Sequence, residues 1–425
     1  MGYFLLSLLI FVLVLGMPVA FGMGIVALAY LVVSGEFLLI PIPQKIYSGM
    51  DSFLLLAVPF FLLAGSLMNH GGITRRLVEF ATTLVGHFKG SLGHVTVVAN
   101  MIMAGMSGTA AADAVATGTV LIPAMVKQGY SRGFAAAISA SAATIGPVIP
   151  PSVGFVIFGS LTGVSIGQLF LAGFIPGILM GFYLMAACYL VARKRGYGAT
   201  SERASARQVG RAFIRAGPAM LTPLWVLGGM VGGFVTATEA AAVAVLYALF
   251  LGVCYRELKL RQFPKILTEA VVMTSVVYFL VGIFNLLGWI MAIEQIPQAV
   301  ANGFLAFTDN PVMVLLIINV VLLLLGMVME PVPMMVLLGP MLIEVTTHFG
   351  IDPVHFGVIF MLNILIGVVT PPIGLNMFIA CSIAKCSVGE FTRESIPFMA
   401  ALILLLLVIT YVPEITLFLP ELLIR

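Results

Sequence analysis

The stretch GMSGTAAADAVATG (105–118) decides the fold, because it is polar and glycine-rich inside a chain that is otherwise suited to lipid. The 425 residues are 61% hydrophobic and only 9% charged, with a mean hydropathy of +1.17. Soluble domains carry about 25% charged residues. An aspartate at the centre of a bilayer costs roughly 2.5–3.5 kcal/mol on insertion scales. The sequence therefore predicts an all-α polytopic membrane protein, in which the cost of Asp113 needs an explanation.

Apolar runs between breaker residues predict ten spans that could each cross a hydrocarbon core of ~30 Å. They cover residues 2–15, 17–34, 52–69, 131–162, 167–194, 216–234, 237–254, 267–288, 353–384 and 396–419. Two further apolar segments, 92–127 and 311–347, are interrupted midway by Gly, Pro or acidic residues, so each is expected to form a re-entrant hairpin. The mixed connectors 37–50 and 256–266 are expected to lie along the membrane surface.

Lys and Arg orient these spans. If the N-terminus lies outside, 18 of the 20 basic residues fall on the cytoplasmic side, and only Lys45 and Arg425 fall outside. This bias follows the positive-inside rule and predicts that both termini lie on the outer side. It also accounts for the net charge of +3 without a nucleic-acid partner.

No motif in the sequence indicates a disulfide, a metal cluster or a nucleotide. The cysteines lie in or beside apolar segments without metal-ligand spacing, and they are expected to act as small hydrophobic residues: Cys188, Cys254, Cys381 and Cys386. The chain has no phosphate-binding loop and no dinucleotide fingerprint. No organic cofactor is expected, and ATP does not drive any work from within this chain.

The chain repeats itself at a shift of 221 positions. Residues 105–151 align with 326–372 without a gap, and thirteen of the 47 positions are identical. The identities include breakers, such as Gly146 with Gly367 and the proline pairs that follow them. Each half then holds five spans and one hairpin, and because five is odd, the halves are expected to have inverted topology. Paired interruptions in inverted halves are typical of the binding site of a secondary transporter.

The four interruptions predict the chemistry of that site. A double proline unwinds a span and leaves the carbonyl groups before it without helical partners, here at 146–149 and 367–370. Free carbonyls with Ser and Thr hydroxyls suit Na⁺. Helices that restart near 112, 152, 333 and 373 would point amide donors inward, which suits a carboxylate.

Two carboxylates, Asp113 and Glu330, lie in the predicted hairpins. Asp113 falls in the first turn of a restarting helix, where an acid also stabilises the helix dipole, so a purely structural role stays open. Glu330 has no such role and is expected to bind a polar or cationic group of the substrate or to tune the cation site. Asn376 follows the second proline pair and is expected to face the pocket, whereas Asn363 could simply bridge two helices.

Three other interpretations stay open. The glycines and prolines could merely kink helices for packing. GMSG (105–108) matches the nucleophile motif of intramembrane serine proteases, with His94 as a conceivable base, although its counterpart GMVM has no serine. A passive channel is the third, but two closed cation cages favour alternating access. Thr236 with Glu239 and Asp352 with Pro353 are expected to be ordinary helix caps.

Four motifs resemble a known family along essentially the whole chain. They are VPFFLLAGSLMNHGGIT (58–74), MAGMSGTAAADAVATGTVLIPAM (103–125), GYSRGFAAAISASAATIGPVIPPS (129–152) and GVVTPPIGLNMF (367–378). They closely resemble the large membrane subunit (DctM type) of TRAP, or tripartite ATP-independent periplasmic, transporters. The resemblance implies a Na⁺-driven elevator transporter in a bacterial inner membrane, without enzymatic activity. It also implies a separate small four-helix membrane subunit, and a periplasmic binding protein that delivers an organic acid such as a C4-dicarboxylate, sialic acid or sugar acid.

The resemblance also implies roles for individual residues. The first Na⁺ site would use Ser107, Gly108, Gly146, Val148 and Pro150, and the second would use Gly326, Gly367 and Thr370. Substrate would lie near Asp113 and Glu330, with Ser107, Thr109, Ser152 and Asn376 beside them. Some relatives carry Asp where Glu330 stands, and the extra methylene changes its reach.

These expectations divide the chain into scaffold and transport parts. The scaffold parts are 1–50 and 216–266, and the transport parts are 51–166 and 267–390. Residues 167–215 form one span and the linker between the repeats, and residues 391–425 form the last span. The transport parts would slide across the membrane as one body. A single-chain divalent-anion/sodium symporter, which works without a binding protein, is the alternative within the same class.

Overall fold

The structure, a computed structural model, describes residues 7–8, 11–12, 17–35, 40–199 and 202–424, with the backbone alone at 304–307. These residues form helices and no strand, as the composition predicts. The predicted span 2–15 lies mostly outside the described residues. The elements are α2 (Val19–Ser34), α3 (Pro41–Met50), η1 (Leu54–Leu56), α4 (Ala57–His70), α5 (Ile73–Val85), α6 (Ser91–Ser107), α7 (Ala110–Lys127), α8 (Arg132–Ala143), α9 (Val153–Thr162), α10 (Ile166–Arg195), α11 (Ala206–Val231), α12 (Ala237–Cys254), η2 (Leu260–Gln262), α13 (Phe263–Ile293), α14 (Ile296–Phe307), α15 (Pro311–Gly326), α16 (Pro331–His348), α17 (Pro353–Gly367), α18 (Leu375–Ala384), α19 (Val388–Tyr411) and α20 (Glu414–Leu423).

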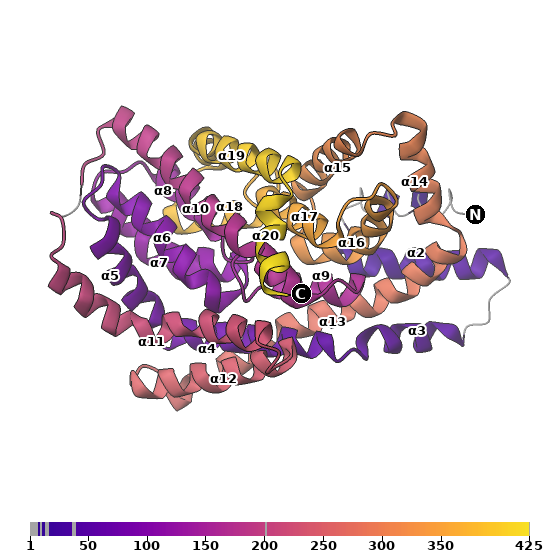
Figure 1. Ribbon diagram of the computed structural model, residues 1–425, viewed down its shortest axis with the longest axis horizontal. Coiled ribbons are helices and arrows are strands. Elements are labelled where there is room, and N and C mark those ends of the chain that lie inside the picture. The colour runs from indigo at the N-terminus through magenta and orange to yellow at the C-terminus, as the bar shows by residue number, and fades with distance from the viewer. Residues whose placement is uncertain (1–6, 9–10, 13–16, 36–39, 200–201, 425) are drawn as a thin grey trace.

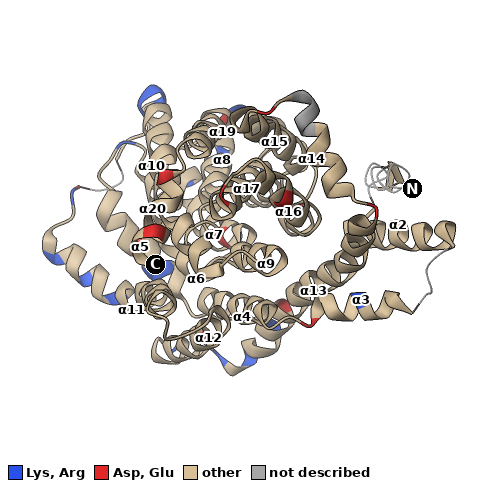
Figure 2. Cartoon of the chain, turned by 45° about the vertical axis from the view of Figure 1, so that its right-hand side comes forward, with Lys and Arg blue, Asp and Glu red and all other residues tan. Residues whose placement is uncertain are grey.

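The helices form two layers (Figure 1). Helices α3, α4, α11, α12 and α13 run along one side, where α12 packs on α4 and α13 packs on α3 and α4. The other layer holds α6–α10 and α15–α19, and Figure 2 shows α7, α9, α16 and α17 at its centre. Helices α4 and α13, which the predicted division assigns to the transport parts, lie in the same layer as α12.

Several helices are long and apolar enough to cross a membrane. Among the described residues there are five, or six if α3 and η1–α4, which meet at a bend of 55°, count as one span. The five are Ala110–Lys127, Ile166–Arg195, Ala237–Cys254, Leu260–Ile293 and Val388–Tyr411. A polytopic membrane protein is therefore confirmed, while the count of ten crossings stays a prediction.

All four predicted interruptions are present. Helix α6 ends at Gly108, which has a φ of +63° and closes the helix in the left-handed conformation. The helices restart at 110, 153, 331 and 375, within two residues of the predicted positions. A proline stands at the restart at 331, and proline pairs end two residues before the restart at 153 and three residues before the restart at 375, where their missing amide donors interrupt the helix.

The observed helices repeat at the same shift of 221 positions as the sequence. Helix α7 (Ala110–Lys127) maps onto α16 (Pro331–His348) residue for residue. The contacts repeat as well: a Cβ built on Gly118 would lie 3.2 Å from Ile383 Cδ1, and one on Gly339 would lie 4.0 Å from Thr162 Cγ2. These two pairs are equivalent under the shift. The hairpin of each half thus packs on the broken helix of the other half in the same way.

Four segments differ from the prediction. Residues 256–266 do not form a separate surface helix; η2 leads straight into α13, because FPKILTEA (263–270) has a proline at the helix start and good helix formers after it. The last span, expected over 396–419, ends at Tyr411, because Pro413 follows. Helices α5 and α14 were not among the predicted spans. The caps at Thr236 and Asp352 are confirmed.

Candidate functional site

Four helix starts meet in a ring at the centre of the protein. A Cβ built on Gly108, just before α7, would lie 3.2 Å from the backbone nitrogen of Val153, the first residue of α9. One built on Gly154 of α9 would lie 3.0 Å from Met335 Cε of α16. The Ile373 amide, before α18, donates a hydrogen bond of 3.1 Å to the Met327 carbonyl at the tip of the α15–α16 hairpin. Helix α18 packs on α7 and closes the ring.

The packed helices α7 and α18 run parallel with their starts at one level. Gly118 and Ile383 touch, and each lies eight residues into its helix. At the other end, Arg132 follows shortly after α7 and donates a hydrogen bond of 3.3 Å to the carbonyl of Lys385, which ends α18. The positive ends of the two helix dipoles therefore lie side by side.

Three of the four starts keep their amide donors free of side-chain caps. Helices α7, α16 and α18 have no such cap, whereas α9 is capped by Ser152. The first turn of α7 presents the amide groups of Ala110, Ala111 and Ala112. Helix α16 presents fewer, because prolines occupy its first and third positions, and in α18 the Asn376 amide donates to the Val368 carbonyl. The ring is thus suited to an anion.

Asp113 is the buried acid of this site. It is fully buried, and neither of its carboxylate oxygens has a hydrogen-bond partner among the described residues. A Cβ on Gly146 would overlap Asp113 Oδ2, so the carboxylate lies directly against the Gly146 backbone. The Ser107 hydroxyl, also buried, lies near this carboxylate and has no hydrogen-bond partner elsewhere among the described residues. A buried carboxylate needs a cation or a proton, because burying an isolated charge is expensive.

Asn100 and Thr117 join the two arms of the hairpin beside this acid, and the sequence analysis missed both. The Thr117 hydroxyl donates a hydrogen bond of 2.8 Å to the Asp113 carbonyl and interacts with the Asn100 side chain, whose amide donates to it over 3.2 Å. The pair joins α6 to α7. A polar residue on each arm of a predicted hairpin was the sequence pattern that could have predicted this contact.

The other residues predicted for the first site point in different directions. Ser152 donates to the Pro147 carbonyl over 2.5 Å and accepts from the Phe155 amide over 3.1 Å, so its hydroxyl is occupied by its own loop. The Val148 carbonyl points toward Gly173 of α10, where a built Cβ would lie 2.5 Å away. The Pro150–Pro151 bond is cis, as is Pro371–Pro372. The structure therefore brings together Ser107, Gly108, Asp113 and Gly146, with Val148 behind them.

The residues predicted for the second Na⁺ site also lie together. A Cβ on Gly367 would lie 2.5 Å from the Gly326 carbonyl oxygen, so the two backbones touch. Thr370 donates its hydroxyl to Ile366 O over 2.7 Å and its amide to Gly367 O over 2.9 Å. These oxygens already have protein partners. Asn376 is different, because its side-chain oxygen and nitrogen are buried without partners among the described atoms.

Glu330, the acid of the second hairpin, differs from Asp113 in its exposure to solvent. Glu330 is the N-cap residue of α16, is exposed, and makes no side-chain cap. Thr109, the N-cap residue of α7, is half-buried and also uncapped. Asn363 bridges helices, donating 2.7 Å to Asn319 Oδ1 of α15. The two hairpins are thus alike in backbone but differ in the environment of their acids.

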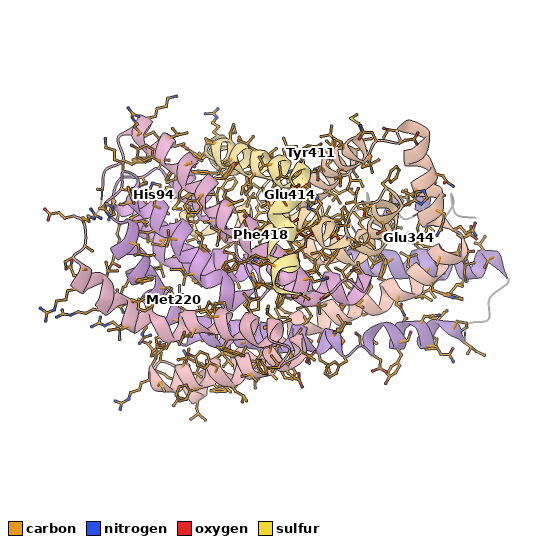
Figure 3. The ribbon with its side chains drawn as sticks, in the orientation of Figure 1. His94, Met220, Glu344, Tyr411, Glu414 and Phe418 are labelled. Atoms are coloured by element: carbon orange, nitrogen blue, oxygen red, sulfur yellow. The ribbon has the colours of Figure 1, made fainter. Side chains whose placement is uncertain are left out.

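A serine-protease arrangement is excluded by distance. His94 and Ser107 lie thirteen residues apart on the unbroken helix α6, with His94 toward its start (Figure 3). At 1.5 Å per residue they are ~20 Å apart. His94 cannot act as a base for Ser107.

The family of the DctM component of tripartite ATP-independent periplasmic transporters matches residues 6–415. The chain belongs to this family. As a TRAP permease it is a transporter subunit and not an enzyme. The sialic acid TRAP transporter large permease protein SiaM of Vibrio cholerae is 45% identical over 96% of this chain and 95% of that protein. The isethionate TRAP transporter permease protein DctMQ of Oleidesulfovibrio alaskensis is 39% identical over 98% of this chain and 65% of that protein.

The fold of this TRAP permease is similar to that of a solved transporter. Neisseria gonorrhoeae MtrF, described within a class of antimetabolite efflux pumps, matches with a TM-score of 0.57 over 88% of this chain and 84% of that chain. The sequences are 12% identical, so the likeness concerns the fold alone.

Proposed function

We propose that this TRAP permease carries out Na⁺-coupled uptake of a small organic acid anion across a bacterial inner membrane, with both termini on the periplasmic side. The ring of helix starts beside the unpaired carboxylate of Asp113 carries this proposal. Amide donors at the helix starts would hold the anionic group of the substrate. Asp113, Ser107 and the backbone of Gly108 and Gly146 would hold Na⁺ next to it.

Sodium ions fit the first site better than the second. Asp113 and Ser107 have buried oxygens without partners, and unwound backbone carbonyls are the usual ligands of Na⁺ in such transporters. At the second site, formed by Gly326, Gly367 and Thr370, the Gly367 carbonyl already accepts a hydrogen bond from the Thr370 amide, and the Thr370 hydroxyl is already donated to Ile366 O. Bound Na⁺ would neutralise the negative charge of Asp113, which otherwise repels an anion at the neighbouring helix starts. Binding of Na⁺ and binding of the anionic substrate would therefore each strengthen the other.

We further propose that two inverted repeats, each with five spans and one hairpin, move substrate by an elevator mechanism. The equivalent contacts of Gly118 with Ile383 and Gly339 with Thr162 support a two-fold relation between the halves. The two layers of Figure 1 support a division into a scaffold layer and a transport layer. The packing of α4 and α13 beside α12 favours placing these helices with the scaffold.

The substrate class and partners follow from the family and its members. Sialic acid and isethionate, named for two relatives, are both organic acids that are anionic at neutral pH, one a carboxylate and the other a sulfonate. A carboxylate of the sialic acid, sugar acid or C4-dicarboxylate type is our proposal for this chain. A periplasmic binding protein would deliver it, and a small four-helix membrane subunit would complete the permease within the lipid. The tripartite family disfavours a single-chain symporter.

Uptake into proteoliposomes tests the coupling. With the permease, its small subunit and the loaded binding protein, we expect substrate uptake only with an inward Na⁺ gradient. Collapsing that gradient at constant ionic strength should stop it. Equal uptake with K⁺ in place of Na⁺ would overturn the proposal.

Glu330 is expected to affect substrate more than Na⁺. Because it is exposed at an uncapped helix start, Glu330→Gln removes a charge from the entrance without disturbing the core. We expect a change of about tenfold in the half-saturating substrate concentration, measured as initial uptake rates, with Na⁺ dependence unchanged. Glu344→Gln, in the same helix but fourteen residues further on, is the control. A shifted Na⁺ dependence with unchanged substrate dependence would contradict this assignment.

A further inference from the structure

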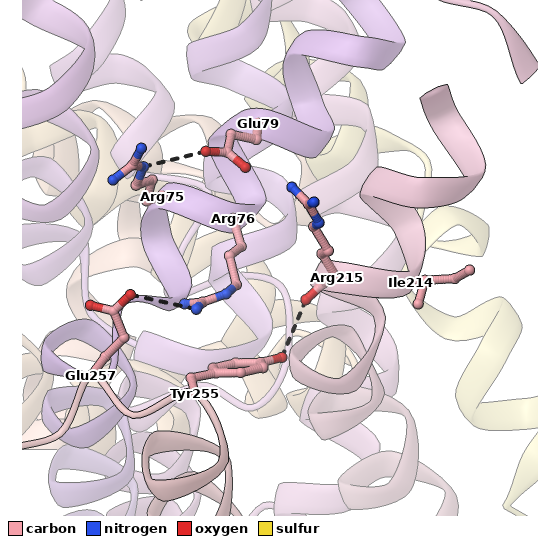
Figure 4. Close-up of a pocket in the computed structure, with 7 residues that line it drawn as sticks. All are labelled: Arg75, Arg76, Glu79, Ile214, Arg215, Tyr255 and Glu257. Carbon is pink, nitrogen blue, oxygen red and sulfur yellow. Dashed lines mark hydrogen bonds and ion pairs between the residues drawn. The ribbon is translucent and has the colours of Figure 1, made fainter. Parts of the chain in front are cut away.

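A cavity lined by arginines lies at the surface, away from the ring of helix starts. Its volume is about 410 Å³, and it lies between α5, the first half of α11 and the turn after α12 (Figure 4). Three arginines and two glutamates line it together with one tyrosine and one isoleucine: Arg75, Arg76, Glu79, Arg215, Glu257, Tyr255 and Ile214. Positive charge is therefore in excess.

Arg76 and Tyr255 form the rigid wall of this cavity. Arg76 donates to Gly72 O over 2.9 Å, pairs with Glu257 at 3.5 Å, and stacks on the Tyr255 ring with its guanidinium carbon 4.1 Å from the centroid. The Tyr255 hydroxyl donates to Arg215 O over 3.3 Å, which ties α11 to the wall. These contacts fix the shape of the cavity before any ligand arrives.

Two arginines remain available to a ligand. Arg215 is exposed, and its guanidinium has no acidic partner in the described part of the chain. Arg75 pairs with Glu79 at 3.3 Å on the same helix, but both side chains are largely in solvent, where such a pair contributes little. Figure 4 shows Arg76 and Arg215 on neighbouring walls of the cavity, with Arg75 at its rim turned toward Glu79. Guanidinium groups in this arrangement match the oxygens of a phosphate.

The surroundings of Arg215 indicate that the phosphate belongs to a lipid. Phe213 and Ile214 beside it are exposed, and so are Leu221 and Leu224 further along α11. Leu221 lies six residues, or ~9 Å along the helix, from Arg215. At 3.6 residues per turn, Ile214, which lines the cavity, and Leu221 lie on one face of α11, whereas Leu224 lies on the side opposite Arg215. The exposed face formed by Ile214 and Leu221 leads away from the cavity and fits an acyl chain below a headgroup. Basic pockets between membrane helices are known to bind anionic headgroups.

We propose that this cavity binds the phosphodiester headgroup of an anionic phospholipid, with its acyl chains along the apolar face of α11. The site is independent of the transport site. It would fasten α5 and α11 to the turn after α12 at the membrane surface.

Thermal unfolding of the full chain in detergent tests the site. We expect saturable stabilisation by dilauroyl phosphatidylglycerol, and none by the matching phosphatidylcholine or by inorganic phosphate. Arg215→Gln should raise the half-saturating phosphatidylglycerol concentration about fivefold, the effect of one arginine near a membrane surface. Arg75→Gln should also raise it, and it provides a second variant should Arg215→Gln not fold.

Arg207→Gln is the matched control, because Arg207 lies on α11 two turns before Arg215 and outside the cavity. It should change the half-saturating concentration less than about twofold. Equal effects of Arg207→Gln and Arg215→Gln would mean diffuse attraction and overturn the site. Stabilisation by inorganic phosphate alone would identify a free anion and overturn the lipid. Equal stabilisation by phosphatidylcholine would show that the negative charge of the headgroup is not recognised, and would overturn the proposal of an anionic lipid.

Discussion

Asp113→Asn is expected to abolish Na⁺-coupled uptake while the protein stays folded. Asparagine has nearly the shape of aspartate, so the contact with Gly146 and the hairpin around it should persist. The charge that would hold Na⁺ is lost. Mutation of a residue that only supports a metal ligand typically lowers metal affinity about 10–100-fold. We therefore expect the substitution of Asp113 itself to lower Na⁺ affinity by at least about 100-fold. Initial uptake rates against Na⁺ concentration measure it.

Thermal unfolding gives a second measurement that needs no partner. A ligand at one hundred times its dissociation constant stabilises a protein by about 2.7 kcal/mol. Wild-type protein should therefore melt at a higher temperature in NaCl than in choline chloride of equal strength, and Asp113→Asn should not. Asp309→Asn, in the exposed turn before α15, should respond as the wild type does. A full Na⁺ response in Asp113→Asn would remove this acid from the cation site.

The interruptions could be predicted from the sequence because their causes are local. A proline lacks its amide donor wherever it stands, and glycine adopts the left-handed conformation of Gly108 without cost. The helix restarts were therefore predicted within two residues. The repeat was predictable because breakers recur at a fixed shift. It predicted that the halves are alike, but it could not predict which faces meet.

The environment of each acid could not be predicted, because it depends on packing between distant segments. Asp113 and Glu330 lie in equivalent hairpins, yet Asp113 is fully buried and Glu330 is exposed. Under the shift of 221, Asp113 corresponds to the buried Met334, and Glu330 corresponds to Thr109, so the two acids do not occupy equivalent positions. Their neighbours differ as well: Gly146 lies on Asp113, whereas the corresponding Gly367 lies on the backbone of Gly326. Gly146 and Gly367 are identical in sequence but not in what they contact.

Ser152 shows a second limit of the sequence. The family resemblance implies that Ser152 lies near the substrate, and in the structure its hydroxyl joins Pro147 to the first turn of α9. Serine is a good helix cap, so the structural role was available from the same residues. The path of the loop decides between the two roles. The double proline determines that path, and the preferences of single residues do not predict it.

Gly146→Ala is expected to disable the site without touching any charged group. Its methyl group would overlap Asp113 Oδ2 and come within 3.1 Å of the carboxylate carbon. Overpacking of this kind costs about 1–3 kcal/mol, and the carboxylate is the group that can give way. We expect Na⁺ affinity to fall at least about tenfold, measured by uptake and by the Na⁺-dependent thermal shift.

Gly217→Ala is the matched control, because it adds the same methyl group to helix α11 with nothing within 4 Å. It should leave the Na⁺ response unchanged and stabilise the helix slightly. A double variant sharpens the test: in the Asp113→Asn background, Gly146→Ala should cause no further loss of Na⁺ affinity, since residues in contact are not additive. Independent losses from the two substitutions would mean that Gly146 acts on Na⁺ through its own carbonyl and not through the position of Asp113.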